Sequence, residues 1–160
     1  MDAQQLRAVI MDAFSSTPHP GMQNTTEHSC GECDELRNTF GPMEWEAIPQ
    51  DIIDDNFGQL SLFTPEAYRY FLPAYLLRCL DNFDPDNMVC EFVIYSLTPD
   101  NNENGKQWAA ERHDLLDQKQ KDAMVAFLKH VLAAESFKDF HTEAADGLRR
   151  CWVAREENAI

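Results

Sequence analysis

The sequence predicts an all-α fold: a single compact, irregular bundle of five to seven unequal helices around a kinked central helix. Apolar residues recur at three- and four-residue spacing in most segments, as on the buried face of a helix. Capping residues precede several of these segments, and no two segments resemble strands that could pair with each other. A chain of 160 residues suits one domain with its own core, so we expect the domain to span residues 1–160.

The N-terminal third is expected to form short helices separated by breaks. The first helix covers Ala3–Phe14, with Asp2 as its candidate N-cap. A second covers Asp34–Phe40 and ends at Gly41–Pro42. A third, short helical turn is expected over Pro49–Ile53, because proline is favoured where a helix begins.

The central helix is predicted over Pro65–Leu80. Thr64 is a good N-cap, Pro65 occupies the first helical position, and Glu66 complements the positive end of the helix dipole. The segment is apolar on almost every side, which is typical of a helix buried in the middle of a domain. Pro73 is expected to kink this helix, because its ring removes one backbone hydrogen bond.

The segment Met88–Leu97 suits either a strand or a short buried helix, since it is rich in apolar and β-branched residues. We expect a helix, because a single strand without a partner cannot satisfy its backbone hydrogen bonds. A polar loop rich in Asn and Asp follows over residues 98–105. A short helix is then expected over Lys106–His113, around Trp108.

Two C-terminal helices are predicted from their capping residues. Asp117 and Gln120 form a capping-box pattern at the start of a helix that reaches Ala134. A last helix is expected over Glu143–Arg155, with Thr142 as its N-cap.

One stretch carries a family resemblance. Residues 63–76 read Phe-Thr-Pro-Glu-Ala-Tyr-Arg-Tyr-Phe-Leu-Pro-Ala-Tyr-Leu, and this resembles the signature of a family of small bacterial proteins known only as a domain of unknown function. The flanks agree loosely with that layout at Phe14, at the Cys30–Cys33 and Trp45 region, and at Phe127. The resemblance implies a shared fold and implies nothing about chemistry.

Charge is the unusual property of this chain. The formal net charge is −15, and residues 1–100 carry 17 acidic against four basic residues. Direct nucleic-acid binding is disfavoured, because no basic surface for phosphates is present, and an anionic membrane would repel the chain. The excess of acids is either a solubility device or a surface that steers the protein onto a basic partner.

The densest acidic stretch, Glu27–Asp55, holds nine acids and one base. If it is an interface, the candidate binding residues are Glu44, Glu46, Asp54 and Asp55. Trp45 and Phe57 are candidate aromatic anchors within it, although core packing is the expected role of Trp45.

The N-terminus lacks the features of a signal peptide and no apolar run is long enough to span a membrane, so a cytoplasmic location is expected. In that compartment the five cysteines stay reduced. Cys79, Cys90 and Cys151 lie among apolar neighbours and are expected to be buried.

Cys30 and Cys33 have the spacing of metal ligands, because two thiolates separated by two residues can bind one tetrahedral zinc ion. His28 is a candidate third ligand, and His19, or a residue such as His141 brought in by the fold, is a candidate fourth. The alternatives are a redox dithiol and a pair of free thiols.

Arg69 lies between two tyrosines of the central helix. It is expected either to extend to solvent or to pair with a carboxylate. It could also line a ligand pocket together with Tyr68, Tyr70 and Tyr75. No phosphate-binding glycine loop or serine-nucleophile motif is present, and the histidines show no triad spacing.

Three classes of function follow from these features. The favoured one is a non-enzymatic acidic interaction protein that engages a basic protein partner, as immunity proteins and nuclease inhibitors do, with a structural zinc site as a further feature. The alternatives are a metal-dependent enzyme at His28, Cys30 and Cys33, and a small-ligand-binding domain around Arg69.

Overall fold

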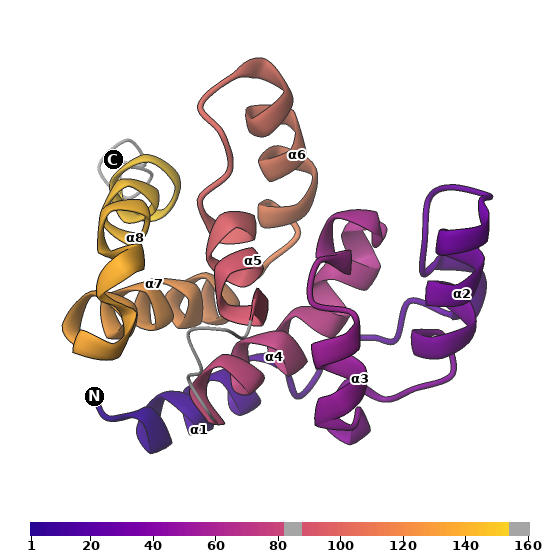
Figure 1. The fold of residues 1–160 in the computed structure, drawn as a ribbon, viewed down its shortest axis with the longest axis horizontal. Helices are drawn as coiled ribbons and strands as arrows, with labels where there is room; N and C mark the ends of the chain where they lie inside the picture. The colour runs from indigo at the N-terminus through magenta and orange to yellow at the C-terminus, as the bar shows by residue number, and fades with distance from the viewer. Residues whose placement is uncertain (82–87, 154–160) are drawn as a thin grey trace.

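A computed structural model describes residues 1–81 and 88–153 of the chain. The predicted all-α bundle is confirmed: the described residues form eight α-helices, with short 3-10 segments between several of them (Figure 1). Their bounds are α1 Ala3–Phe14, α2 Gly31–Phe40, α3 Gln50–Asp55, α4 Pro65–Asp81, α5 Met88–Leu97, α6 Glu103–His113, α7 Gln118–Ala133 and α8 His141–Gly147.

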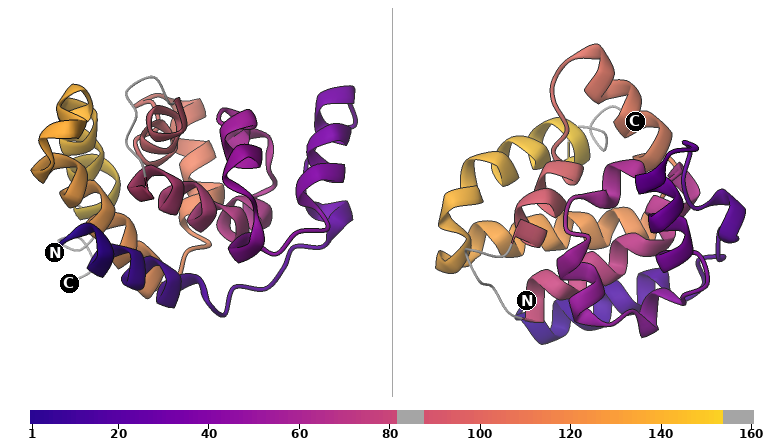
Figure 2. Two further views of the ribbon diagram at one scale, coloured as in Figure 1. Left: turned by 60° about the horizontal axis from the view of Figure 1, so that its bottom comes forward. Right: turned by 45° about the vertical axis from the view of Figure 1, so that its right-hand side comes forward.

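Helix α4 is the centre of the bundle and packs against α1, α3, α5 and α6. Helix α1 runs along α4 and α7, and α7 in turn supports α8 (Figures 1 and 2). Helix α2 lies at the opposite end of the molecule from α7 and α8 (Figure 2). No described helix is both long and apolar enough to cross a lipid bilayer.

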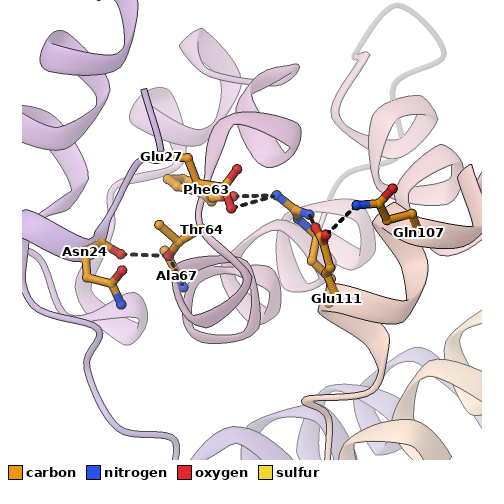
Figure 3. Close-up of polar contacts among 8 residues, drawn as sticks. Asn24, Glu27, Phe63, Thr64, Ala67, Gln107 and Glu111 are labelled. Atoms are coloured by element: carbon orange, nitrogen blue, oxygen red, sulfur yellow. Dashed lines mark hydrogen bonds and ion pairs between the residues drawn. The ribbon is translucent and has the colours of Figure 1, made fainter. Parts of the chain in front are cut away.

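The start of α4 is the helix cap that the sequence predicts. The Thr64 hydroxyl accepts a hydrogen bond from the backbone N–H of Ala67 at 3.1 Å and donates one to the carbonyl of Asn24 at 2.7 Å (Figure 3). The helix continues past Pro73, which is buried, to Asp81. Thr64 therefore satisfies a free N–H of the central helix and also fixes the chain before α2 to it.

Replacing Thr64 by alanine is expected to lower the free energy of unfolding by about 1–2 kcal/mol, because both hydrogen bonds are lost at a buried cap. Urea denaturation measures this change. Thr142→Ala is the matched control: Thr142 is exposed and lies inside α8, so its loss is expected to stay within about 0.5 kcal/mol. Equal urea midpoints for the two variants would contradict the cap.

Four helix starts differ from the prediction, and the smallest difference is at α3, which begins at Gln50 because Pro49 is its N-cap. Helix α2 begins at Gly31 because the Cys30 side chain caps it, and α6 begins at Glu103 because Asn102 caps it. The prediction of Thr142 as an N-cap is wrong: a 3-10 segment runs through Phe140 directly into α8, so the helix has already begun at His141. A π-helical turn continues from α8 to Val153, and Arg155 lies outside the described residues.

The core is continuous and rich in aromatic residues. The rings of Phe40, Phe63 and Phe71 pack edge to face or tilted, with ring centres 5.2–5.4 Å apart. Trp45 is 5% exposed, which confirms it as a core residue rather than a surface anchor. The predicted burial holds for Cys79 and Cys90, whereas Cys151 is half-buried.

Candidate functional site

A hollow of about 620 Å³ lies beside α5 and α6, next to the 3-10 segment Gln59–Leu62. Three aromatic side chains line it: Phe92, Tyr95 and Trp108. Polar lining residues are Ser61, Ser96, Asp100, Asn102 and Asn104. We call this hollow the α5–α6 groove. Its size and its mixture of aromatic and polar groups are typical of small-molecule sites.

One wall of the groove is the end of α5 and the turn after it, residues 96–100. The last carbonyls of a helix have no partner within the helix and need donors from elsewhere. Here His113 Nε2 donates to the carbonyl of Ser96 at 2.9 Å, and Trp152 Nε1 donates to that of Leu97 at 2.9 Å. Arg150 Nη2 donates to the carbonyl of Pro99 at 3.0 Å. Three side chains from α6 and the C-terminal turn thus fix this wall.

Two glycines let neighbouring helices approach the same wall. A Cβ atom on Gly105 would lie 2.0 Å from the carbonyl oxygen of Asp100. A Cβ atom on Gly147 would lie 2.0 Å from the Thr98 methyl group. Because neither glycine can be replaced without moving the chain, α6 and α8 hold residues 98 and 100 by direct contact. Each residue from 96 to 100 therefore has a hydrogen-bond donor at its carbonyl or a close neighbour from another element.

The buried side chain of Tyr68 contacts two residues that line the groove. The Tyr68 hydroxyl lies 3.1 Å from the Ser96 hydroxyl, which donates to the carbonyl of Val93 at 2.8 Å. The Tyr68 ring meets Trp108 edge to face with ring centres 5.3 Å apart. Burial raises the pKa of Tyr68 far above its ordinary value, so this phenol stays protonated. It therefore serves as a hydrogen-bonding support and not as a base.

Arg112 holds Trp108 in place from the side of the core. Its guanidinium carbon lies 4.7 Å from the centre of the Trp108 ring, and its Nη2 donates to the carbonyl of Phe63 at 2.9 Å. Glu27 and Glu111 lie 3.8 and 3.5 Å from its nitrogens (Figure 3). Only 2% of Arg112 is exposed, and its charge faces these two partly exposed carboxylates.

The groove itself is acidic. Asp100 is the one lining residue among those described that is charged at neutral pH. Behind it, the Tyr95 hydroxyl donates to Glu91 at 2.9 Å. This hydrogen bond, burial, and the charges of Glu91 and Glu143 raise the pKa of Tyr95. The groove therefore presents aromatic rings and the exposed Asp100 carboxylate to solvent.

The predicted zinc ligands are brought together only in part. Cys30 and Cys33 meet at the start of α2, where the Cys33 backbone N–H lies 3.4 Å from the Cys30 sulfur. His28 is exposed next to them. His19 is held elsewhere: its Nδ1 accepts from the Gly21 N–H at 3.0 Å and its Nε2 donates to the Met43 carbonyl at 3.1 Å.

In the described part of the chain, no three His, Cys, Asp or Glu side chains come close enough together to hold a metal ion. His141, the other fourth ligand considered, has its Nε2 3.0 Å from the Ala134 carbonyl, at the turn after α7. Burial, followed by the neighbouring Cys30 thiol, raises the pKa of Cys33.

Zinc binding at His28, Cys30 and Cys33 stays a prediction with a direct test. If zinc is structural, strong chelation lowers the melting temperature, because binding free energy is part of folding free energy. Cys30→Ser is then expected to lower it equally and to abolish any further effect of chelator, whereas Cys151→Ser keeps the chelator effect. A protein that elemental analysis shows to lack zinc, and that is equally stable with and without chelator, contradicts the prediction.

The four predicted acidic binding residues divide into two kinds. Glu44 accepts a 2.6 Å hydrogen bond from Tyr70, and Asp54 accepts two from Arg78 at 2.8 and 2.9 Å. Glu46 and Asp55 are exposed. The first two residues thus hold the fold together, and reversing the charge of Asp54 would be expected to destabilise it.

The structure does not gather Arg69 and its three tyrosines around one pocket. Arg69 donates to Gln120 at 2.9 Å and lies 3.7 Å from Asp117, at the start of α7. The hydroxyls of the tyrosines point to three other places: Tyr68 to Ser96, Tyr70 to Glu44, and Tyr75 to the Asn56 carbonyl. Arg69 therefore ties α4 to α7, in agreement with the expectation that it pairs with a carboxylate.

Comparisons with known proteins give a family and no activity. The model of a family of unknown function, DUF6714, matches residues 2–156, so the resemblance to an uncharacterised family is confirmed. No curated protein and no solved structure matches this chain.

Proposed function

Because this chain belongs to the DUF6714 family, whose function is unknown, we propose a function from its own residues: a non-enzymatic interaction protein that binds a basic protein partner. Immunity proteins and nuclease inhibitors are examples of this class. The net charge of −15 favours cationic partners over nucleic acids and anionic membranes.

The observation that carries the proposal is a group of unpaired acids around α3. Glu46, Asp51 and Asp55 are exposed, and Asp51 and Asp55 lie one helical turn apart. None of them forms an ion pair with any cation in residues 1–81 or 88–153. We call these three residues the α3 acidic surface. Charges that the fold does not use remain available to steer a cationic partner.

Three other acids of the same stretch form ion pairs within the fold. Asp34 pairs with Arg37, Asp54 with Arg78, and Glu27 with Arg112. Glu46, Asp51 and Asp55 are therefore the acids around α3 that stay available to a partner, and Glu32 and Glu35 of α2 are exposed as well. A ligand site around Arg69 has less support, because its three tyrosines face different elements.

Charge reversal tests this proposal. Immobilised protein is used to capture basic proteins at about 0.05 M and 0.3 M salt, since screening weakens contacts between exposed charges. Glu46→Lys with Asp55→Lys is expected to reduce capture of the salt-sensitive partner about ten-fold or more, with little change in melting temperature. Glu135→Lys with Asp139→Lys changes the net charge equally at exposed positions elsewhere and is expected to preserve capture.

Equal capture by both double variants would show that net charge alone acts, and would contradict a specific α3 acidic surface. Capture that is independent of salt in the wild-type protein would also contradict it.

A further inference from the structure

The α5–α6 groove combines an apolar body with one sign of charge. Phe92, Tyr95 and Trp108 supply aromatic surface, and Asp100 supplies the one charge among the described lining residues. Aromatic rings attract cations through their negative faces, and a carboxylate in a partly enclosed site strengthens that preference. The aromatic rings and the carboxylate therefore both favour a cationic ligand.

Several positively charged side chains lie near the groove. The nearest buried cation is Arg112, which Glu27 and Glu111 balance. Lys106, Arg149 and Arg150 line an adjoining hollow, which shares Pro99, Asp100 and Gly105 with the groove.

Both arginines share the single carboxylate of Asp146, at 2.7 and 2.6 Å, and Lys106 forms no ion pair within residues 1–81 or 88–153, so two of these three positive charges remain unbalanced. The N-terminus of α6 carries the positive end of its helix dipole. The Asn102 side chain caps it by accepting a hydrogen bond from the Gly105 N–H at 2.8 Å, and the negative charge of Glu103 lies in the first turn. Glu91 and Glu143 add negative potential at Tyr95. Four carboxylates, Asp100, Glu91, Glu103 and Glu143, thus face two unbalanced positive charges, so the net charge around the groove is negative.

The groove wall is also built to keep its shape. Ser96, Leu97 and Pro99 each have a carbonyl held by a side chain from another element, and Thr98 and Asp100 are held by the close approach of Gly147 and Gly105. When a site keeps its shape, less binding free energy is spent on ordering side chains and loops, so the ligand binds more tightly.

We propose that the α5–α6 groove binds an organic cation: an amine or guanidinium group carried on an apolar or aromatic body. The cationic group pairs with Asp100, and the body lies against Phe92, Tyr95 and Trp108. Two sources can present this chemistry: a free small molecule, or an arginine or lysine side chain of a protein. The proposal uses none of the residues of the α3 acidic surface and does not depend on the function proposed above.

The test uses three size-matched probes on the whole protein, followed by two-dimensional NMR: phenethylamine, the anion 3-phenylpropionate, and the neutral phenethyl alcohol. Phenethylamine is expected to bind about ten-fold more tightly than 3-phenylpropionate and to shift amide signals of residues 92–108. A blocked Gly-Arg-Gly peptide forms a second arm. Binding of this peptide assigns the source to a protein side chain, and binding of the amine alone assigns it to a free small molecule.

Two variants locate the site. Asp100→Asn is expected to weaken phenethylamine binding about 3- to 10-fold while the melting temperature is kept. Tyr95→Ala removes an exposed ring, and it is expected to weaken phenethylamine binding more than Asp100→Asn does. Asp139→Asn, an exposed acid outside the groove, is the matched control and is expected to bind like the wild type.

Three results would overturn the proposal: equal or tighter binding of 3-phenylpropionate, unchanged affinity in Asp100→Asn, or no binding of either cationic probe at 10 mM (about −2.7 kcal/mol as a binding limit).

Discussion

Replacing Trp152 by alanine is expected to lower the free energy of unfolding by about 3–5 kcal/mol. The indole is 6% exposed, its ring centre lies 4.7 Å from that of His113, and its Nε1 donates to the Leu97 carbonyl. The variant therefore loses a large buried side chain and also leaves a carbonyl at the end of α5 without its donor.

Urea denaturation measures this loss, and two further variants separate its causes. Trp152→Phe keeps most of the packing and removes the hydrogen bond, so it is expected to lose about half as much. Val153→Ala, at a neighbouring side chain that is 38% exposed, is expected to lose less than about 1 kcal/mol. A loss below about 1 kcal/mol for Trp152→Ala would mean that the last turn is peripheral to the core.

Arg112→Ala is expected to cost about 2–4 kcal/mol. The Phe63 carbonyl, in a fully buried residue, would lose its donor, and the face of Trp108 would lose the guanidinium that covers it. The loss is not expected to exceed this range, because Glu27 and Glu111 are both partly exposed and can be hydrated once Arg112 is removed.

Glu111→Gln is the control for this prediction, since it removes one exposed ion-pair partner and is expected to change stability by less than about 1 kcal/mol. The measurement is again the free energy of unfolding in urea. Similar losses for Arg112→Ala and Glu111→Gln would show that the ion pair, and not the buried contacts with Phe63 and Trp108, is what matters.

The helices were predictable because their signals are local. The caps at Asp2, Thr64 and Asp117 are each confirmed, and Met88–Leu97 forms the expected helix. Each cap joins residues three positions apart, so composition and spacing suffice to identify it. The failure at Thr142 is local as well: a helix was expected to begin at Glu143, whereas the preceding residues are already helical.

The groove was not predictable, because it depends on contacts between distant residues. Trp108 and the polar loop of residues 98–105 were each visible in the sequence, but nothing in their spacing places them against Phe92 and Tyr95. The predicted acidic residues show the same limit. The partners of Glu44 and Asp54 lie 26 and 24 residues away, and only the fold shows that their charges are used internally.

The way residues 96–100 are held also sets the order in which this protein can fold. The donors for the carbonyls of Ser96, Pro99 and Leu97 follow them in the chain by 17, 51 and 55 residues. Closing the two longer loops costs conformational entropy. The contacts that offset this cost form only when α7 and α8 have docked. During synthesis the N-terminal helices can therefore collapse first, whereas the groove wall takes its final shape only after Arg150 and Trp152 have been made.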